Sequence, residues 1–155
     1  MNAEFFKEIM RRYPTGITIA SCRLGDLNYG VTMNSFISIS LNPPLIGVFV
    51  TKGTTASKYL TESKRFVINI LAEDQEYLAV RFSSGNPLNR FQGIEFIESE
   101  YGPIINNTIA YLACELYATI DIADNVLIIG IVKNGKIVSD KKPLIYFMRK
   151  YIKLL

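Results

Sequence analysis

The feature that most constrains the fold is a series of short apolar segments, rich in β-branched residues, that turn residues separate more often than helices do. Runs rich in Ile, Val, Thr and Ser predict strands, and the strict alternation in Ile37–Asn42 predicts a strand with one wet face. Strands and helices do not alternate regularly, which argues against a parallel βαβ sheet. We therefore predict a mainly β fold, a closed or nearly closed antiparallel barrel with small helices packed on it. The expected strands span residues 17–23, 29–40, 45–50, 66–71, 109–122, 126–138 and 143–151.

Three short helices are predicted around these strands. Asn2 can cap the first, which carries apolar residues on one face and ends before Pro14. The second begins after Thr54 or Thr55 and runs through Glu62, and the third spans residues 73–82. Residues 25–28 are typical of a hairpin turn, residues 83–87 of a loop, and Asn134-Gly135 of a turn or bulge inside a strand.

The residue inventory excludes several classes of function. The chain has 155 residues, of which 49% are hydrophobic, and this length suits one domain spanning residues 1–155. With no His and two Cys, it cannot supply the roughly four ligands of a structural zinc site, and we expect no metal. Catalysis by Ser-His-Asp or Cys-His groups is excluded for the same reason. No glycine-rich dinucleotide fingerprint and no Walker A motif occurs, which argues against a Rossmann or P-loop enzyme.

Composition also bears on location. The most apolar stretch, residues 109–132, is interrupted by carboxylates and does not predict a membrane span, and residues 1–4 show no signal peptide. Cys22 and Cys114 are expected to be reduced core residues of a cytoplasmic protein; the alternative is a buried disulfide in an intracellular hyperthermophile protein. The net charge is +3, with basic residues gathered near both ends. They predict either solvated surface or an anion site for phosphate or nucleic acid.

Two segments have residues that could bind a ligand. Residues 30–45 place small hydroxyls and an amide beside exposed backbone, before the rigid Pro43-Pro44. Such an edge can meet the N and O atoms of a flavin ring, although a strand with a hydroxylated solvent face would look the same. Residues 51–57 combine a Lys, a Gly and hydroxyls at a predicted helix start, which can cradle an anion or be an ordinary capped helix.

The order of these segments resembles the flavin reductase family, the small reductase components of two-component flavin-dependent monooxygenases. The resemblance runs over nearly the whole chain. The segments that carry it are, in chain order, Tyr13–Gly16, Gly30–Phe36, Ser40–Leu45, Phe66–Leu71, Leu78–Ser83, Gly102-Pro103, Leu112–Cys114 and Pro143–Tyr146.

This resemblance implies an FMN-binding split β-barrel, antiparallel and Greek-key-like, that works as a homodimer. It implies FMN or FAD as cofactor or loosely held substrate, NADH or NADPH as hydride donor, and an aromatic hydroxylase that uses reduced flavin as partner. Carried over position by position, it assigns the isoalloxazine and ribityl chain to Thr32, Met33, Asn34, Ser35, Phe36, Ser38 and Ser40. It assigns further cofactor contacts to Val50 and Thr51, the phosphate end to Lys52, Gly53, Thr54, Thr55, Ser57, Arg81, Phe82 and Ser83, and closure of the nicotinamide side to Tyr146 and Arg149.

One stretch departs from the family's pattern. Where many members carry Gly-Asp-His, this chain has Ala123-Asp124-Asn125. Asn125 is the one candidate for a catalytic side chain and can hydrogen bond a carboxamide, but it cannot carry charge. No protein nucleophile is required, because hydride passes between cofactors.

Two other functions fit the residues. The first is a flavoprotein oxidase or electron carrier that keeps its FMN on the same barrel. The second is a basic β-barrel that binds single-stranded nucleic acid on its tyrosines, which the order of motifs argues against. Our expectation is therefore a reductase without nucleic-acid or membrane partners.

Overall fold

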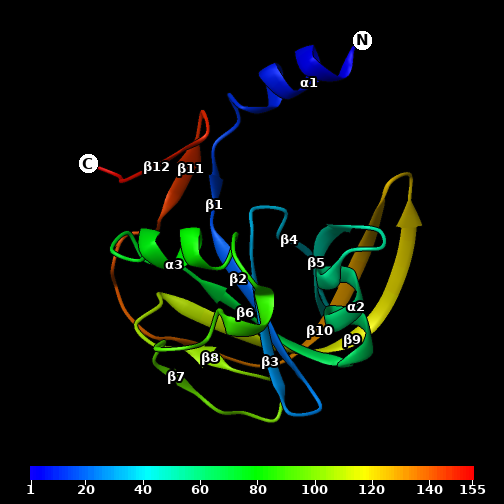
Figure 1. Cartoon of the computed structure of the whole chain (residues 1–155), viewed down its shortest axis with the longest axis vertical. Helices are drawn as coiled ribbons and strands as arrows, with labels where there is room; N and C mark the ends of the chain where they lie inside the picture. The colour runs from blue at the N-terminus through cyan, green and yellow to red at the C-terminus, as the bar shows by residue number, and fades with distance from the viewer.

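In the computed structural model, which describes residues 1–155, seven strands form one antiparallel sheet that curls around a core (Figure 1). Their order across the sheet is β3-β2-β6-β9-β10-β5-β4. The end strands β3 and β4 do not pair with each other, so hydrogen bonding leaves the barrel open between them. The predicted antiparallel, mainly β class is confirmed, and full closure is not formed. The strands are β2 (Thr18–Leu24), β3 (Leu27–Met33), β4 (Ile37–Leu41), β5 (Pro44–Thr51), β6 (Arg65–Ile70), β9 (Ala110–Ile122) and β10 (Asn125–Ile137).

Smaller elements surround this sheet. A three-stranded sheet joins β1 (Thr15–Gly16), β11 (Ile145–Phe147) and β12 (Lys150–Ile152), and β7 (Phe96–Ile97) pairs with β8 (Ile104–Ile105). The helices are α1 (Ala3–Met10), α2 (Thr55–Glu62), α3 (Glu76–Arg81) and the 3-10 turn η1 (Pro87–Asn89). None of them is long and apolar enough to cross a membrane. Helix α1 projects from the barrel beside β11 and β12 (Figure 1).

Two apolar clusters hold the sheet in its curled form. Inside the curl, Tyr29 and Met33 of β3 share one cluster with Val48 and Val50 of β5, and α2 adds the fully buried Leu60. The end strand β3 therefore meets β5, the strand next to the other end, through side chains rather than through backbone hydrogen bonds. A second cluster joins Leu78, Ala79 and Phe82 with Ile17, Ile19, Leu71, Ile105 and Leu144, and so packs α3 against the outside of β2 and β6.

Several predicted boundaries are confirmed by local contacts. The Asn2 side chain accepts a hydrogen bond from the Phe5 amide at 2.8 Å and caps α1. Thr54 caps α2 in the same way through the Ser57 amide. The register of β9 and β10 shifts between Val132 and Asn134, which is the predicted bulge. Both cysteines are buried and free, as expected of core residues.

Other predictions need correction. The strand predicted at 29–40 is two strands, because residues 34–36 break it and send β4 to the opposite end of the sheet. The strand predicted at 143–151 is a hairpin, since Met148 and Arg149 adopt φ angles of 50° and 62° that reverse the chain. The third helix starts at Glu76 rather than at residue 73, and β7 and β8 were not predicted at all.

The apolar alternation in β4 also has an unexpected outcome. Ile37, Ile39 and Leu41 are 53%, 44% and 94% exposed, so the strand has no buried face within one chain. The apolar residues of α1 are exposed as well. These faces need another surface to cover them.

Candidate functional site

The site lies where the sheet is split. A cavity of about 420 Å³ opens between β3, β5 and the start of α2. Eight of the predicted cofactor contacts line it together: Thr32, Met33, Asn34, Ser35, Val50, Thr51, Thr54 and Thr55. Residues 31–35 and 49–56 contribute most of this lining; they are remote in sequence, and the curl of the sheet brings them together. The lining also includes Tyr29, Val31, Phe49, Ala56, Pro87 and Arg90, which the sequence did not indicate.

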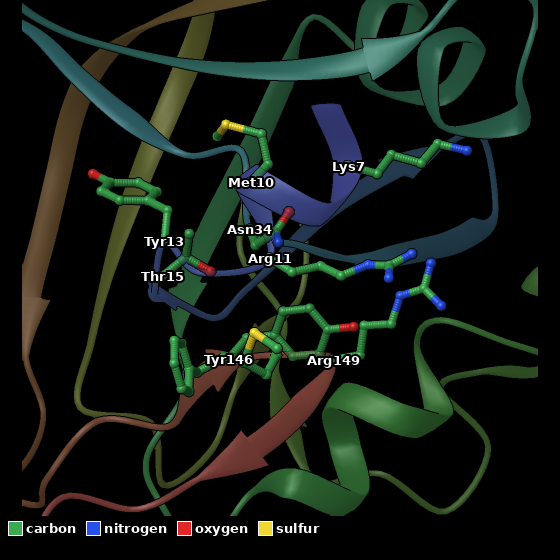
Figure 2. A pocket seen from close by; sticks show the side chains of 10 residues that line it. Lys7, Met10, Arg11, Tyr13, Thr15, Asn34, Tyr146 and Arg149 are labelled. Carbon is green, nitrogen blue, oxygen red and sulfur yellow. The ribbon is translucent and has the colours of Figure 1, made fainter. Parts of the chain in front are cut away.

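Further cavities adjoin this one. Gly53 and Ser57 line a neighbouring space of about 520 Å³ that shares Thr54, Thr55 and Pro87 with the first. Phe36 and Tyr13 line another of about 430 Å³. Tyr146 and Arg149 line a groove of about 430 Å³ between α1 and the β11–β12 hairpin (Figure 2). Asn34 lines the first cavity and this groove, so the two meet at its side chain.

The hydroxyl groups at the split make hydrogen bonds that hold the fold together. Ser35 Oγ donates to the Phe49 carbonyl at 2.9 Å and accepts from the Phe49 amide at 3.2 Å, which fixes the break between β3 and β4 to β5. Thr32 Oγ1 donates to the Ala79 carbonyl at 2.7 Å and ties β3 to α3. The Asn34 amide is exposed and has no such partner. Asn34 is therefore the group at the split that is free to bind a ligand.

The start of α2 provides hydrogen-bond donors. Thr54 Oγ1 donates to the Thr51 carbonyl at 2.7 Å and accepts from the Ser57 amide at 3.3 Å. The amides of Thr55 and Ala56, in the first turn, are left without a partner inside the helix. Together with the positive end of the helix dipole, they favour an anion.

Arg90 places a positive charge in the cavity wall. It is only 9% exposed, and no carboxylate lies within ion-pairing distance. Its Nη1 donates to the Gly30 carbonyl at 2.9 Å and its Nε to the Ser84 carbonyl at 3.2 Å, and the guanidinium also hydrogen bonds with the Tyr29 side chain. A buried guanidinium that has no carboxylate partner is unfavourable unless an anion joins it. The only signal for it in the sequence is a basic residue in an irregular loop, and no periodicity marks such a position.

The same cation affects its neighbour Tyr29, which lines the cavity and stacks on Tyr59 with ring centroids 4.9 Å apart. Burial raises the pKa of the Tyr29 hydroxyl, and the charge of Arg90 opposes this effect. The hydroxyl therefore stays protonated at neutral pH and can act as a hydrogen-bond donor.

Some predicted contacts lie elsewhere. Ser38 and Ser40 are on β4 and line none of the cavities described above. The Lys52 ammonium lies 3.6 Å from the Asp121 carboxylate, on the side of β9. Ser83 Oγ donates to the Val80 carbonyl, and Phe82 is fully buried against Phe91.

Arg81 supports the site indirectly. Its guanidinium donates to the carbonyls of Asn89, Arg90 and Gln92 at 3.3, 2.6 and 2.5 Å. These bonds hold the loop that carries Arg90. Arg81 is therefore placed as a positioning residue for the cavity wall.

Asn125 begins β10 opposite Thr51, next to the β9–β10 turn. Its Nδ2 donates to the Asp124 carboxylate at 3.0 Å, and the Asp124 carbonyl accepts from the Lys52 amide. Ala123 has a φ of 50°, the left-handed conformation that glycine adopts without strain. The structure thus forms a turn at the stretch where the resemblance predicts Gly-Asp-His, with the Asn125 amide at the position predicted for a His ring.

A family model described as the flavin reductase like domain matches residues 10–154. The chain belongs to this family. Among flavin reductase relatives, the reductase component of 4-hydroxyphenylacetate 3-monooxygenase from Thermus thermophilus is 31% identical over 152 residues, which cover 98% of this chain and 97% of that protein. The flavin-dependent monooxygenase reductase subunit HsaB of Mycobacterium tuberculosis is 33% identical over 139 residues, or 89% of this chain and 74% of that protein.

Solved flavin reductases share the fold. HpaC, in a complex with NADP⁺, is 38% identical, with a TM-score of 0.92 over 99% of this chain and 98% of that one. PheA2 in its native state is 30% identical, with a TM-score of 0.91 over 100% and 99% of the two chains. The split sheet and its small helices are therefore the architecture of flavin reductases.

Proposed function

We propose that this chain is an NAD(P)H:flavin oxidoreductase, formed as one domain over residues 1–155. It reduces FMN or FAD with a hydride from NADH or NADPH and supplies the reduced flavin to a partner monooxygenase that hydroxylates an aromatic compound. Family membership and the names of the relatives support this reaction. The free, buried state of both cysteines fits a reducing compartment such as the cytoplasm.

The observation that carries the proposal is the buried Arg90 in a cavity that has no carboxylate to neutralise it. Cavities of a few hundred Å³ hold cofactor-sized ligands, and the two spaces that share Thr54 and Thr55 can take a ring at one end and a phosphate at the other. Arg90, the free amides of α2 and Thr55 would hold the phosphate. Asn34 and the backbone beside it would meet the polar edge of the ring.

The bound flavin supplies the electron chemistry, since its ring system accepts a hydride. The chain's own side chains bind, orient and exclude water. Asn34 stands between the proposed flavin cavity and the groove that Tyr146 walls, so it can orient a nicotinamide against a flavin. No protein group has to take up or release a proton in the transfer, which suits a chain without His.

A steady-state assay tests the reaction directly. The purified protein is mixed with FMN, FAD or riboflavin and with NADH or NADPH, and nucleotide oxidation is followed in each combination. We expect flavin-dependent turnover that falls strongly in the Asn34→Ala variant and persists in Arg23→Met, an exposed residue far from the site. Absence of turnover with every pair would refute the proposal. Flavin that stays bound through purification would instead favour a flavoprotein that keeps its cofactor.

We also infer that the enzyme is a homodimer, because a continuous apolar surface lies outside the curl. Register places Ile37, Phe49, Leu127 and Ile120 on one side of the neighbouring strands β4, β5, β10 and β9, opposite the core residues Val48 and Ile128. Of these outward residues, Ile37, Phe49 and Ile120 are 53%, 39% and 47% exposed. A surface of this kind normally marks a protein interface, and a second copy would cover it with the same residues. Phe49 also lines the proposed flavin cavity, so the interface would border the site.

Light scattering tests the dimer. We expect a mass about twice the 17.5 kDa of one chain. Ile37→Asp combined with Ile120→Asp should give a monomer, while the control Ile97→Asp, on the exposed side of β7, should leave the dimer intact. A monomer in the unmodified protein would refute the inference.

A further inference from the structure

The groove between α1 and the β11–β12 hairpin collects cations that the proposed chemistry does not use. Lys7, Arg11 and Arg149 line it with Tyr13 and Tyr146 (Figure 2). In that view the guanidinium groups of Arg11 and Arg149 extend toward one another. Two like charges that converge in this way repel each other, so the arrangement favours a shared anion between them.

The local carboxylates do not neutralise this cluster. Glu4 pairs with Lys7 at 3.3 Å on the exposed surface, where an ion pair neutralises the charge only weakly. Glu8 is shared, with its carboxylate 2.6 Å from Arg12 and 2.9 Å from Arg11, and these two partners lower its pKa. Arg149 has no acidic partner. The two walls of the groove therefore carry five cations and two carboxylates. The cations are Lys7, Arg11, Arg12, Arg149 and Lys150, and the carboxylates are Glu4 and Glu8.

The groove is also structurally defined, although its two walls come from opposite ends of the chain. The Met148 amide donates to the Arg11 carbonyl at 3.1 Å and joins the hairpin to the end of α1. The positive φ of Arg149 turns its backbone at the tip of the hairpin. Thr15 Oγ1, in the same lining, is buried without a hydrogen-bond partner, so the groove has an unsatisfied polar atom as well as excess charge.

We propose that this groove binds the phosphate monoester that distinguishes NADPH from NADH, and that the enzyme therefore prefers NADPH. The inference rests on the proposed function, because Asn34 connects the groove to the flavin cavity and Tyr146 walls the nicotinamide side. A phosphate monoester carries close to two negative charges at neutral pH and offers three oxygens. Two guanidinium forks match that geometry, whereas each phosphate of the pyrophosphate in both nucleotides carries one charge.

The test compares nucleotides in matched variants. kcat/KM is measured for NADPH and NADH, at saturating FMN, in the unmodified enzyme and in Arg11→Gln, Arg149→Gln and Arg12→Gln. Arg12 follows Arg11 directly after α1, and its replacement removes the same charge, but it does not line the groove. We expect NADPH to be preferred by about tenfold or more, and each groove variant to lose about ten- to a hundredfold with NADPH and less than about threefold with NADH. Arg12→Gln should leave the preference unchanged.

Calorimetry with adenosine 2′,5′-bisphosphate and with 5′-AMP gives a readout that does not depend on turnover. Tighter binding of the bisphosphate that disappears in Arg149→Gln supports the site. Three outcomes would overturn it. The groove variants could lose kcat/KM equally with NADPH and NADH, the unmodified enzyme could prefer NADH, or the two adenosine phosphates could bind equally well. If no nucleotide is oxidised with any flavin, the reductase proposal fails, and the calorimetric comparison still decides the phosphate site.

Discussion

Replacing Arg90 by Met separates the role of this residue in the fold from its role toward a ligand. The substitution keeps a long, flexible side chain, removes the charge, and removes the donors to the carbonyls of Gly30 and Ser84. Gly30 is buried and Ser84 is exposed, so only the Gly30 carbonyl loses its partner without access to water. The variant should therefore fold, with a measurable loss of stability.

The two effects have different sizes and different signatures. An unsatisfied buried carbonyl costs about 1–3 kcal/mol, which lowers the melting temperature of a domain of this length by about 2–4 °C per kcal/mol. Loss of a charge-assisted bond to phosphate costs about 1.5–3 kcal/mol, or about ten- to a hundredfold in Kd. The loss of the charge-assisted bond affects only a ligand that carries a phosphate. FMN affinity should fall by that factor, while riboflavin affinity should stay within about threefold.

The assay is quenching of flavin fluorescence, titrated with FMN and with riboflavin in each variant. Arg23→Met provides the control for net charge, since Arg23 is exposed and pairs with Glu98 at 3.0 Å away from the site. Lys52→Met tests the phosphate contact that the sequence predicts, and its position beside Asp121 leads us to expect a smaller effect. The reasoning fails if Arg90→Met weakens riboflavin as much as FMN, or if Lys52→Met weakens FMN more than Arg90→Met does.

Four further predictions concern packing and ionisation. Gly30→Ala should lower the free energy of unfolding by about 1–3 kcal/mol in urea titrations, because the new Cβ would lie 2.6 Å from Phe82 Cε1 and 3.1 Å from Phe91 Cε2; Gly16→Ala, with open space around it, should not, and equal losses would contradict this explanation. Burial raises the pKa of Cys22 and of Cys114 to about 12, so neither thiol should react with a disulfide reagent at pH 8 until the chain unfolds, and labelling of the native protein would show that the burial is wrong. Since both values lie above the ordinary 9.0 of the unfolded chain, their contribution to stability is kept below pH 9.0 and lost as the pH rises toward about 12, which urea midpoints can follow. Reduction of bound flavin by saturating nucleotide should be nearly flat between about pH 6 and 8, because the chain has no His and its thiols do not titrate there; a tenfold sigmoidal change near about pH 6.5 would require another titrating group.

The sequence predicts those parts of the fold that depend on neighbouring residues. Asn2 and Thr54 cap helices because each side chain reaches an amide three residues along the chain. Alternation and β-branching locate most of the strands of the main sheet, and these patterns are local too. What failed depends on contacts between remote segments. Ile37 and Ile39 alternate like a half-buried strand, yet within one chain nothing covers them, because β4 is the end of the sheet.

The site follows the same division. Thr32–Ser35, Val50, Thr51, Thr54 and Thr55 were identified through the order of motifs, and the fold does bring them to one cavity. Arg90 was missed because the irregular stretch around it has no periodicity, and its place in the cavity wall depends on bonds from Arg81 to the loop carbonyls. The sequence indicated the site residues on and beside the strands, whereas the position of the Arg90 charge in its loop depends on tertiary contacts.

This division has a physical reason in the proposed reaction. When cofactors carry the electrons, the protein has to supply shape and fixed charge, and it needs no group that gains or loses a proton. Guanidinium groups suit that task because they stay charged across the neutral range, whereas a His in the same place would lose its charge near pH 6.5. Arg90, Arg11 and Arg149 all lie outside regular strands and helices. Backbone carbonyls hold Arg90, Arg149 has no carboxylate partner, and Arg11 shares the single Glu8 carboxylate with Arg12. A carboxylate of its own would neutralise the charge of Arg90 permanently. Carbonyl partners hold Arg90 in place and leave its charge available to a phosphate, so the pH dependence of flavin binding should come from the phosphate alone.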